Sequence, residues 1–286
     1  MLAMEHVKLK FVRGILFSLS LTTLALAVVS LALLFFTYTY EIELSKQQPM
    51  TSERVYQTYN EVEHALSLLF FNYSGVDVEL TNTTFSYLEN LPNKKAENFK
   101  TQLTRYSLFL GNHSPHVNIK TSTLIHHLPI ILSPHDAWIY HPSYGTASLV
   151  AGGNLSSLHG YFVSILWSQN LSSCESITPP GSMTFNVTLN VTGANNTCFI
   201  SRLVDPEENN VFRFNGGELK IIINNTGNFS LNLQGESELR LNLTFELTPS
   251  SSTLLSLPTD TIKVEYSEFN LTRIGGVRLL YYKNAQ

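Results

Sequence analysis

The chain has 286 residues and a formal net charge of −4 at pH 7, and only 14% of its residues are charged. A nucleic-acid partner requires a basic patch that neutralises phosphates, so we expect no such partner. With so few charges, the polar surface must be built from Ser, Thr and Asn. This composition favours a wall, surface-layer or adhesive protein over a cytosolic enzyme.

Residues 15–37 contain no charged side chain. A helix of this length rises roughly 35 Å, enough to cross a hydrocarbon core of about 30 Å. We therefore predict a transmembrane helix over residues 15–38, with the lipid bilayer as its partner. A cleaved secretory signal is the alternative, because Ala25-Leu26-Ala27 fits a small-X-small cleavage pattern, although this triplet lies inside the apolar run. Both interpretations export the rest of the chain.

The two flanks of the apolar run differ in charge. Lys8, Lys10 and Arg13 precede it, and Glu41 and Glu43 follow it. Basic flanks stay in the cytoplasm, so residues 1–14 are predicted to be a cytoplasmic basic leader. The expected location is the cell membrane, with a single pass and an extracellular C-terminal domain.

Residues 39–115 are predicted to form a helical stem region. Segments 53–71 and 94–110 carry apolar residues at alternating spacings of three and four, which is typical of paired helices. A short strand is expected between them at 76–80, and a linker before them at 45–50. The stripes favour packing within the chain, and a seam for another protein is the alternative.

From residue 116 to residue 286 the pattern changes to short alternating segments separated by Gly, Pro and Asn turns. Strands are expected at 117–123, 128–132, 136–140, 146–150, 160–167, 183–191, 197–204, 210–214, 217–223, 229–233, 237–247, 261–266 and 276–282. Many short antiparallel strands with polar outer faces predict a β-sandwich. The expected fold is therefore mainly β with N-terminal α: one transmembrane helix, a short helical stem and an extracellular antiparallel β-sandwich.

The chain has two cysteines, Cys174 and Cys198. Two thiols in an exported domain most simply pair, and two free buried thiols are the alternative. A bridge that closes a loop of this length contributes about 3 kcal/mol by restricting the unfolded chain.

Twelve Asn-X-Ser/Thr sequences offer glycosylation acceptors, all on the predicted outer side of the anchor. They are Asn72, Asn82, Asn112, Asn154, Asn170, Asn186, Asn190, Asn195, Asn224, Asn228, Asn242 and Asn270. In segments 183–191 and 239–247 the apolar residues alternate with polar ones, which places Asn186, Asn190 and Asn242 on the polar face of a sheet. The alternative is that Asn-X-Thr simply suits a solvated strand.

The histidines cluster in one part of the chain. Seven of the nine histidines lie between His113 and His159, but their spacing matches no metal motif, and we expect no metal and no cofactor. The turn-rich loop around Asp205 offers oxygens for calcium as an alternative to an ordinary solvated turn. The sequence holds no nucleophile or phosphate-loop motif, so we expect no enzyme. An enzyme would require His135, Asp136 and His141 to converge in a pocket.

Aromatic residues offer a different kind of site. Trp138, Tyr140 and Trp167 are candidates for a ligand surface on which a sugar ring stacks. Core packing is the alternative for these residues.

The N-terminal third resembles archaeal type IV pilin-like proteins with class III signal peptides. The resemblance rests on the basic leader, then Gly14, then the apolar run from Ile15, then the helix over 53–71. It implies that a prepilin peptidase cuts between Gly14 and Ile15 and leaves the hydrophobic helix on the mature protein. Bacterial pilins usually carry glutamate at the fifth mature position, where this chain has Leu19. The resemblance implies other pilin-like subunits or cell-envelope components as partners.

These features together predict a non-enzymatic, glycosylated cell-surface protein with a structural, adhesive or envelope-assembly role. A carbohydrate- or envelope-binding module is the first alternative, and a membrane-anchored enzyme is the second.

Overall fold

The computed structural model describes residues 2–143, 146–177, 184–235, 237–250, 253–267 and 270–279, without the side chains of 2–20 and 43–50. The chain is mainly β, with an N-terminal apolar helix and largely antiparallel sheets. It forms two compact units, residues 1–54 and residues 55–286.

Helix α1 spans Leu2–Tyr73 and contains two of the three predicted helices, the transmembrane helix at 15–38 and the first stem helix at 53–71. The linker expected at 45–50 is wrong, because this segment is helical. Most of its residues, such as Lys46 and Gln47, are strong helix formers, and Pro49 does not end the helix. Gly14 and Ile15 fall in the part of α1 whose side chains lie outside the description.

One stretch of α1 is long and apolar enough to cross a membrane. It covers Leu21–Ile42, with a mean hydropathy of 2.1, and none of it is buried. A helix that is apolar on all sides needs an apolar environment around it.

In the unit 55–286, the last turns of α1 pack against α2, which spans Ala96–His113. The buried residues of these two helices are Val55, Tyr59, Val62, Leu66 and Phe70 in α1 and Ala96, Phe99, Leu103 and Leu110 in α2. The rings of Phe70 and Phe99 meet edge to face, with centroids 6.1 Å apart. This confirms that the predicted stripes pack within the chain, with Phe70 in place of Leu69 at the end of the first.

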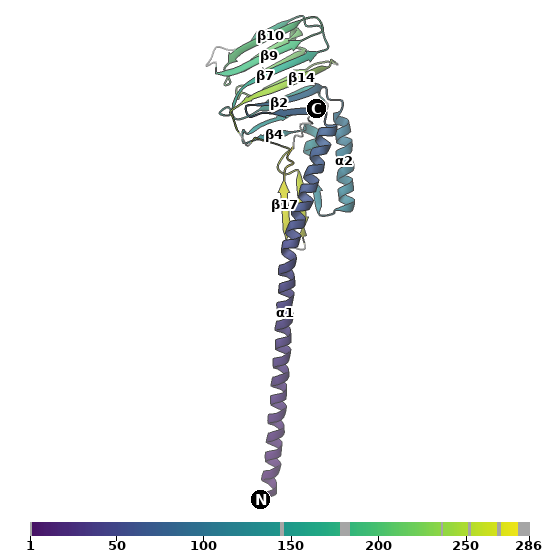
Figure 1. Cartoon of the computed structure of the whole chain (residues 1–286), viewed down its shortest axis with the longest axis vertical. Helices are drawn as coiled ribbons and strands as arrows, with labels where there is room; N and C mark the ends of the chain where they lie inside the picture. Colours follow the sequence, from purple (N-terminus) through teal and green to yellow (C-terminus); the bar gives the residue numbers. More distant parts are fainter. Residues whose placement is uncertain are drawn as a thin grey trace. The chain divides into compact units, whose positions relative to one another are not determined.

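Three sheets follow, in the strand orders β1-β2-β14-β7-β9-β10, β15-β4-β5-β6-β13-β12-β11-β8 and β17-β16-β3. Their neighbours are antiparallel except β7 and β9, which run parallel. Figure 1 shows β10, β9, β7, β14 and β2 side by side in the order of the six-stranded sheet.

The strand bounds are β1 Val76–Leu80, β2 Thr84–Leu91, β3 Val117–Ile119, β4 Ile130–Ser133, β5 Ala137–Tyr140, β6 Ser148–Gly152, β7 Leu158–Trp167, β8 Cys174–Ile177, β9 Phe185–Thr192, β10 Thr197–Val204, β11 Asn210–Phe214, β12 Leu219–Ile223, β13 Phe229–Leu233, β14 Leu239–Leu247, β15 Leu254–Ser256, β16 Ile262–Tyr266 and β17 Leu271–Gly275. Helix α3 spans Thr121–His127, and a 3-10 turn, η1, spans Asn215–Gly217.

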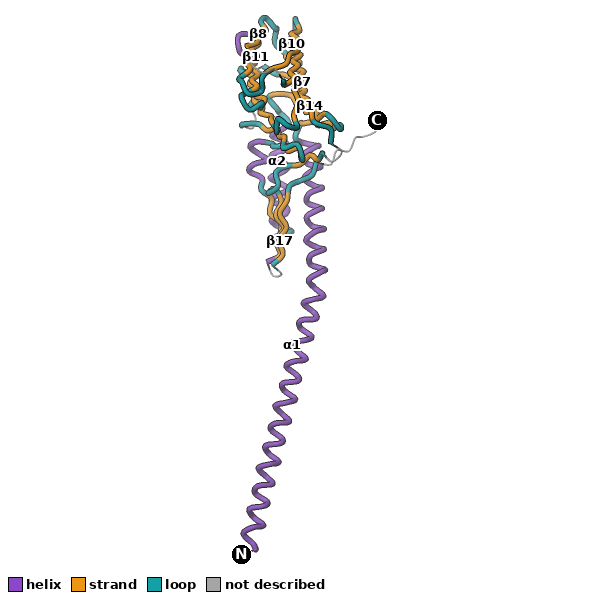
Figure 2. Tube along the Cα trace, turned by 90° about the vertical axis from the view of Figure 1, so that its left-hand side faces the viewer, coloured by secondary structure: helices purple, strands orange, loops and turns teal. Residues whose placement is uncertain are grey.

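The core lies where the inner faces of the two larger sheets meet. Tyr161 of β7 is fully buried, and its ring contacts Phe229 of β13 with centroids 5.5 Å apart. In Figure 2 these sheets stand edge-on, with β8 and β11 in one layer and β7, β10 and β14 in the other. Strict alternation produces this core: every second residue of β9 is buried and the residues between them are half-buried.

The strand expected at 117–123 is wrong in its second half. Strand β3 ends at Ile119, and α3 begins at Thr121. Leu124 and Leu128 are both buried, and their spacing of four residues belongs to a helix face. Leu128 then ends the helix in the left-handed region, with φ of 43°.

The C-terminal strand is also misplaced in the prediction. Strand β17 lies at Leu271–Gly275, and in the described part of the segment expected at 276–282 Arg278 makes only an isolated bridge to Ser256. Residues 280–282 of that prediction lie outside the described residues. Four strands had not been expected: β2, β8, β15 and β17. Strand β2 matters most, since it places the polar cluster described next.

Candidate functional site

A carboxylate lies in the buried row of β2. The alternation of this strand turns Phe85, Tyr87, Glu89 and Leu91 toward the core, and Glu89 is only 2% exposed. A buried carboxylate is costly unless it is paired and hydrogen-bonded. Its surroundings therefore define the most strongly organised polar site in the described part of the chain.

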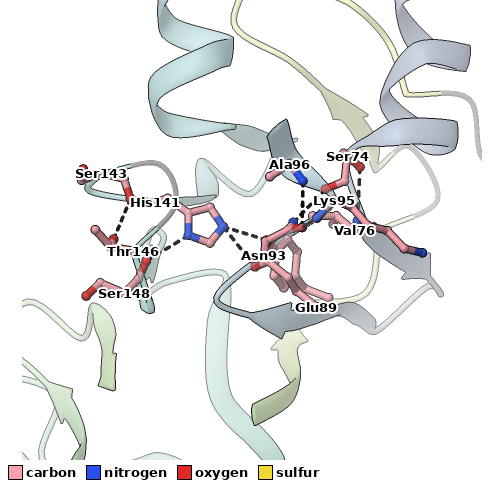
Figure 3. A network of polar contacts seen from close by, with 11 residues as sticks. Ser74, Val76, Glu89, Asn93, Lys95, Ala96, His141, Ser143, Thr146 and Ser148 are labelled. Carbon is pink, nitrogen blue, oxygen red and sulfur yellow. Dashed lines mark hydrogen bonds and ion pairs between the residues drawn. The ribbon is translucent and has the colours of Figure 1, made fainter. Parts of the chain in front are cut away.

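The partner of Glu89 is His141, which directly follows β5 and is also buried. His141 Nε2 lies 3.0 Å from Glu89 Oε2, and Tyr87 donates its hydroxyl to the same oxygen at 2.7 Å. The other ring nitrogen, Nδ1, lies 2.9 Å from the Ser148 carbonyl oxygen. Figure 3 shows the His141 ring between Ser148 on one side and the Glu89 region on the other.

Asn93 completes the network from the turn between β2 and α2. Its Nδ2 donates to Glu89 Oε1 at 2.6 Å and to the Ser74 carbonyl at 2.7 Å. Its Oδ1 accepts the backbone N–H groups of Lys95 and Ala96, which begin α2. One side chain thus joins the end of α1, strand β2 and the start of α2.

The electrostatics favour a charged histidine. Burial lowers the pKa of His141, but the Glu89 charge, its hydrogen bond and the Ser148 carbonyl outweigh this and raise the pKa above its ordinary value. Because each ring nitrogen and each carboxylate oxygen has a partner, the network holds elements together and leaves no open acid or base.

A pocket of about 550 Å³ adjoins the network and shares Asn93 with it. Lys94 and Glu238 form an ion pair across its rim, and Arg240 also lines it. Trp167 lies in its wall and donates its ring N–H to Ser237 Oγ at 3.2 Å.

The three predicted ligand-surface aromatics do not come together. Trp138 and Tyr140 are half-buried on the outer side of β5, with ring centroids 5.2 Å apart. Trp167 belongs to the other large sheet and is only 3% exposed. The sequence could not show this separation, because β5 and β7 enter different sheets.

His135 and His141 have separate partners. His135 Nε2 lies 2.9 Å from Thr253 Oγ1, whereas His141 pairs with Glu89. Across the described ranges, no cluster of three or more His, Cys, Asp or Glu residues has a geometry suited to a metal ion.

The twelve candidate acceptor asparagines are exposed or half-buried. Asn72, Asn82, Asn112, Asn154, Asn170, Asn195 and Asn270 are exposed, and Asn186, Asn190, Asn224, Asn228 and Asn242 are half-buried. Asn242 pairs in register with Ser164, which pairs in turn with Asn190, so both lie in one row on the outer face of the six-stranded sheet. Asn186 donates Nδ2 to the Glu246 carboxylate at 3.3 Å.

A disulfide joins Cys174 and Cys198, whose Cα atoms are 6.4 Å apart. It connects β8 to β10, the last strands of the eight- and six-stranded sheets. Arg202 of β10 donates to Ser176 Oγ of β8 at 2.6 Å and adds a second link between these edges.

No protein-family model matches the chain, and neither a curated protein nor a solved structure is significantly similar to it.

Glu89 and Asn93 were not among the site residues predicted from the sequence. The signal for Glu89 was a charge in the apolar phase of Phe85, Tyr87 and Leu91, which identifies a carboxylate that needs a buried partner. Its partner His141 is 52 residues away and could not be identified without the sheet topology.

Proposed function

We propose that this chain is a membrane-anchored surface protein that displays a β-sandwich outside the cell. The observation that carries the proposal is the apolar stretch Leu21–Ile42, none of which is buried. Exposing so many apolar side chains to water is unfavourable, whereas a bilayer provides the apolar environment that this stretch needs.

The topology follows from charge. The leader 1–14 carries Lys8, Lys10 and Arg13, so it stays in the cytoplasm and the segment after residue 38 faces outward. In this arrangement the helix 15–38 is the anchor. The boundary expected between a stem at 39–115 and a sandwich at 116–286 is wrong, because β1 and β2, within 76–91, belong to the six-stranded sheet.

The role that we propose is structural or adhesive, including participation in a pilin-like assembly or in the cell envelope. Two sheets around one core supply a stiff support, and the Cys174–Cys198 disulfide joins their edges. An oxidised pair fits an exported location. Glycans on the surface asparagines would solvate the unit 55–286, hereafter the head, in a chain of which only 14% of residues are charged.

The anchor is tested by alkaline carbonate extraction of membranes from cells that express the full chain. The full chain should stay in the membrane pellet and dissolve only in detergent. A matched variant lacking residues 15–37 should move to the soluble fraction. Release of the full chain by carbonate would contradict the anchor.

A binding module for carbohydrate or another envelope component is a second candidate function. It is favoured by Trp138 and Tyr140, which stand side by side on the outer side of β5. Trp138→Ala should abolish binding on a glycan array if this pair is the platform. The exposed Phe199→Ala on β10 serves as the control and should leave binding unchanged.

A further inference from the structure

A second pocket, of about 250 Å³, lies within the unit 55–286, between α1 and the C-terminal strands. Tyr56, Tyr59 and Asn60 line it from α1, and Ser256, Arg273 and Arg278 line it from the opposite side. Figure 1 shows β17, which carries Arg273, beside α1.

Arg273 is held by two aromatic rings. Its guanidinium carbon lies 4.3 Å from the centroid of the Tyr56 ring and 4.2 Å from that of Tyr59. Tyr59 is itself fixed, because it is buried and donates its hydroxyl to the Gly276 carbonyl at 2.6 Å. Stacking uses the faces of a guanidinium and leaves the N–H groups at its edge available for an anion.

These N–H groups have no acceptor in the part of the chain that the structure describes. Neither the Arg273 nor the Arg278 guanidinium forms an ion pair or a hydrogen bond there. Glu63, the one carboxylate in the lining, accepts the backbone N–H of Arg278 at 3.0 Å. The lining therefore carries two positive charges against one negative charge, within a chain whose net charge is −4.

The other lining groups are hydroxyls and an amide. Ser256, Thr259 and Asn60 can each donate or accept a hydrogen bond. At about 30 Å³ per water molecule, the pocket has room for roughly eight waters. A volume of this size can also hold a single sugar ring. Size, excess positive charge and hydroxyl partners together fit a hydroxylated ligand with one carboxylate.

We propose that this pocket binds an acidic monosaccharide, a uronic acid unit, with its carboxylate on the edges of Arg273 and Arg278. This proposal rests on the exported location proposed above, since that location is where an acidic polysaccharide would be met. Binding measured in solution tests the pocket separately from the location. If the pocket binds a uronate but the head is found to face the cytoplasm, only the proposed location is overturned.

The test is calorimetric titration of the full chain, purified in detergent micelles. The probes are D-glucuronate and D-galacturonate, with D-glucose, D-galactose, acetate and inorganic phosphate as comparisons. At least one uronate should bind, with its neutral counterpart and acetate each at least about tenfold weaker, because hydrogen bonds to a charged group are worth more than neutral ones. Equal binding of uronate and neutral sugar, phosphate binding as tight as uronate binding, or no saturation by either uronate would overturn the proposal.

Variants locate the binding. Arg278→Gln should weaken uronate binding at least about tenfold. Arg240→Gln removes an arginine from the larger pocket and should leave the affinity unchanged. Arg278→Lys keeps the charge but loses the planar fork, and should give an intermediate affinity. An Arg278→Gln protein that folds and binds uronate as tightly as the parent chain would overturn the assignment.

Discussion

His141 Nε2 lies 3.0 Å from Glu89 Oε2, and these two side chains are among the most deeply buried charged groups in the described chain. The pair joins β2 of the six-stranded sheet to the segment between β5 and β6 of the eight-stranded sheet. Because Asn93 ties the same carboxylate to Ser74 and to the start of α2, helices and sheets meet at one anion. The Glu89–His141 pair therefore connects several elements of the unit 55–286, and its loss should affect all of them.

Removal of this carboxylate should strongly destabilise the unit. Glu89→Ala leaves His141, Tyr87 and Asn93 without their acceptor, and breaking a buried pair in this way costs about 3–5 kcal/mol. Chemical denaturation of the full chain in detergent measures the loss. Glu238→Ala breaks an exposed pair with Lys94 and should cost less than about 1 kcal/mol. Similar losses of unfolding free energy for the two variants would contradict the larger stabilisation expected from the buried network.

Stability should also depend on pH through His141. Its pKa in the folded protein is raised above the unfolded value near 6.5, so the folded state binds the proton more tightly. The stabilisation is fully present below the unfolded pKa and is lost as pH rises through the raised folded pKa. The free energy of unfolding should therefore fall above about pH 6.5, by at most about 1.4 kcal/mol per pH unit for one proton.

A comparison with His141→Gln isolates this contribution. The difference in unfolding free energy between the parent chain and the variant should be largest near pH 6 and shrink toward alkaline pH. A difference that stays constant or grows with rising pH would contradict the raised pKa.

The disulfide should stabilise the head by restricting the unfolded chain. Cys174 and Cys198 are separated by 24 positions, and closing a loop of this size contributes about 3 kcal/mol. The double variant Cys174→Ser, Cys198→Ser should have a free energy of unfolding lower by about that amount, measured as a lower midpoint in denaturant titration. Two titratable thiols in the parent protein under oxidising conditions would count against the bridge.

The acceptor asparagines should differ in glycan occupancy. Exposed acceptors such as Asn82 and Asn154 offer the carboxamide nitrogen to solvent. Asn186 instead holds that nitrogen against the Glu246 carboxylate, so transfer to the folded chain should be poorer there. Glycopeptide mass spectrometry should find Asn186 less occupied, and Glu246→Ala should raise its occupancy. Full occupancy of Asn186 in the parent chain would contradict this.

Helices and strands that bury one face could be predicted from the sequence, because their apolar residues recur with the period of the element. The alternation in 183–191 correctly placed Asn186 and Asn190 opposite the core, and the stripe of 53–71 placed Tyr59 and Leu66 inside. Strand β8 escaped prediction because it is exposed along its whole length and so carries no alternation. Strand β2 does alternate and was missed although its pattern was present in the sequence.

The candidate sites were less predictable, for a reason of topology. Glu89 and His141, or Tyr56 and Arg273, are brought together only by the order of strands and helices, which local periodicity does not specify. The separation of Trp167 from Trp138 has the same cause.

The proposed topology puts the head, residues 55–286, outside a membrane that the N-terminal helix crosses. Adding protease to intact cells tests this topology, with an antibody against the head as the readout. The head should be digested on intact cells while a cytoplasmic control protein survives. A head that resists until the cells are opened would contradict it.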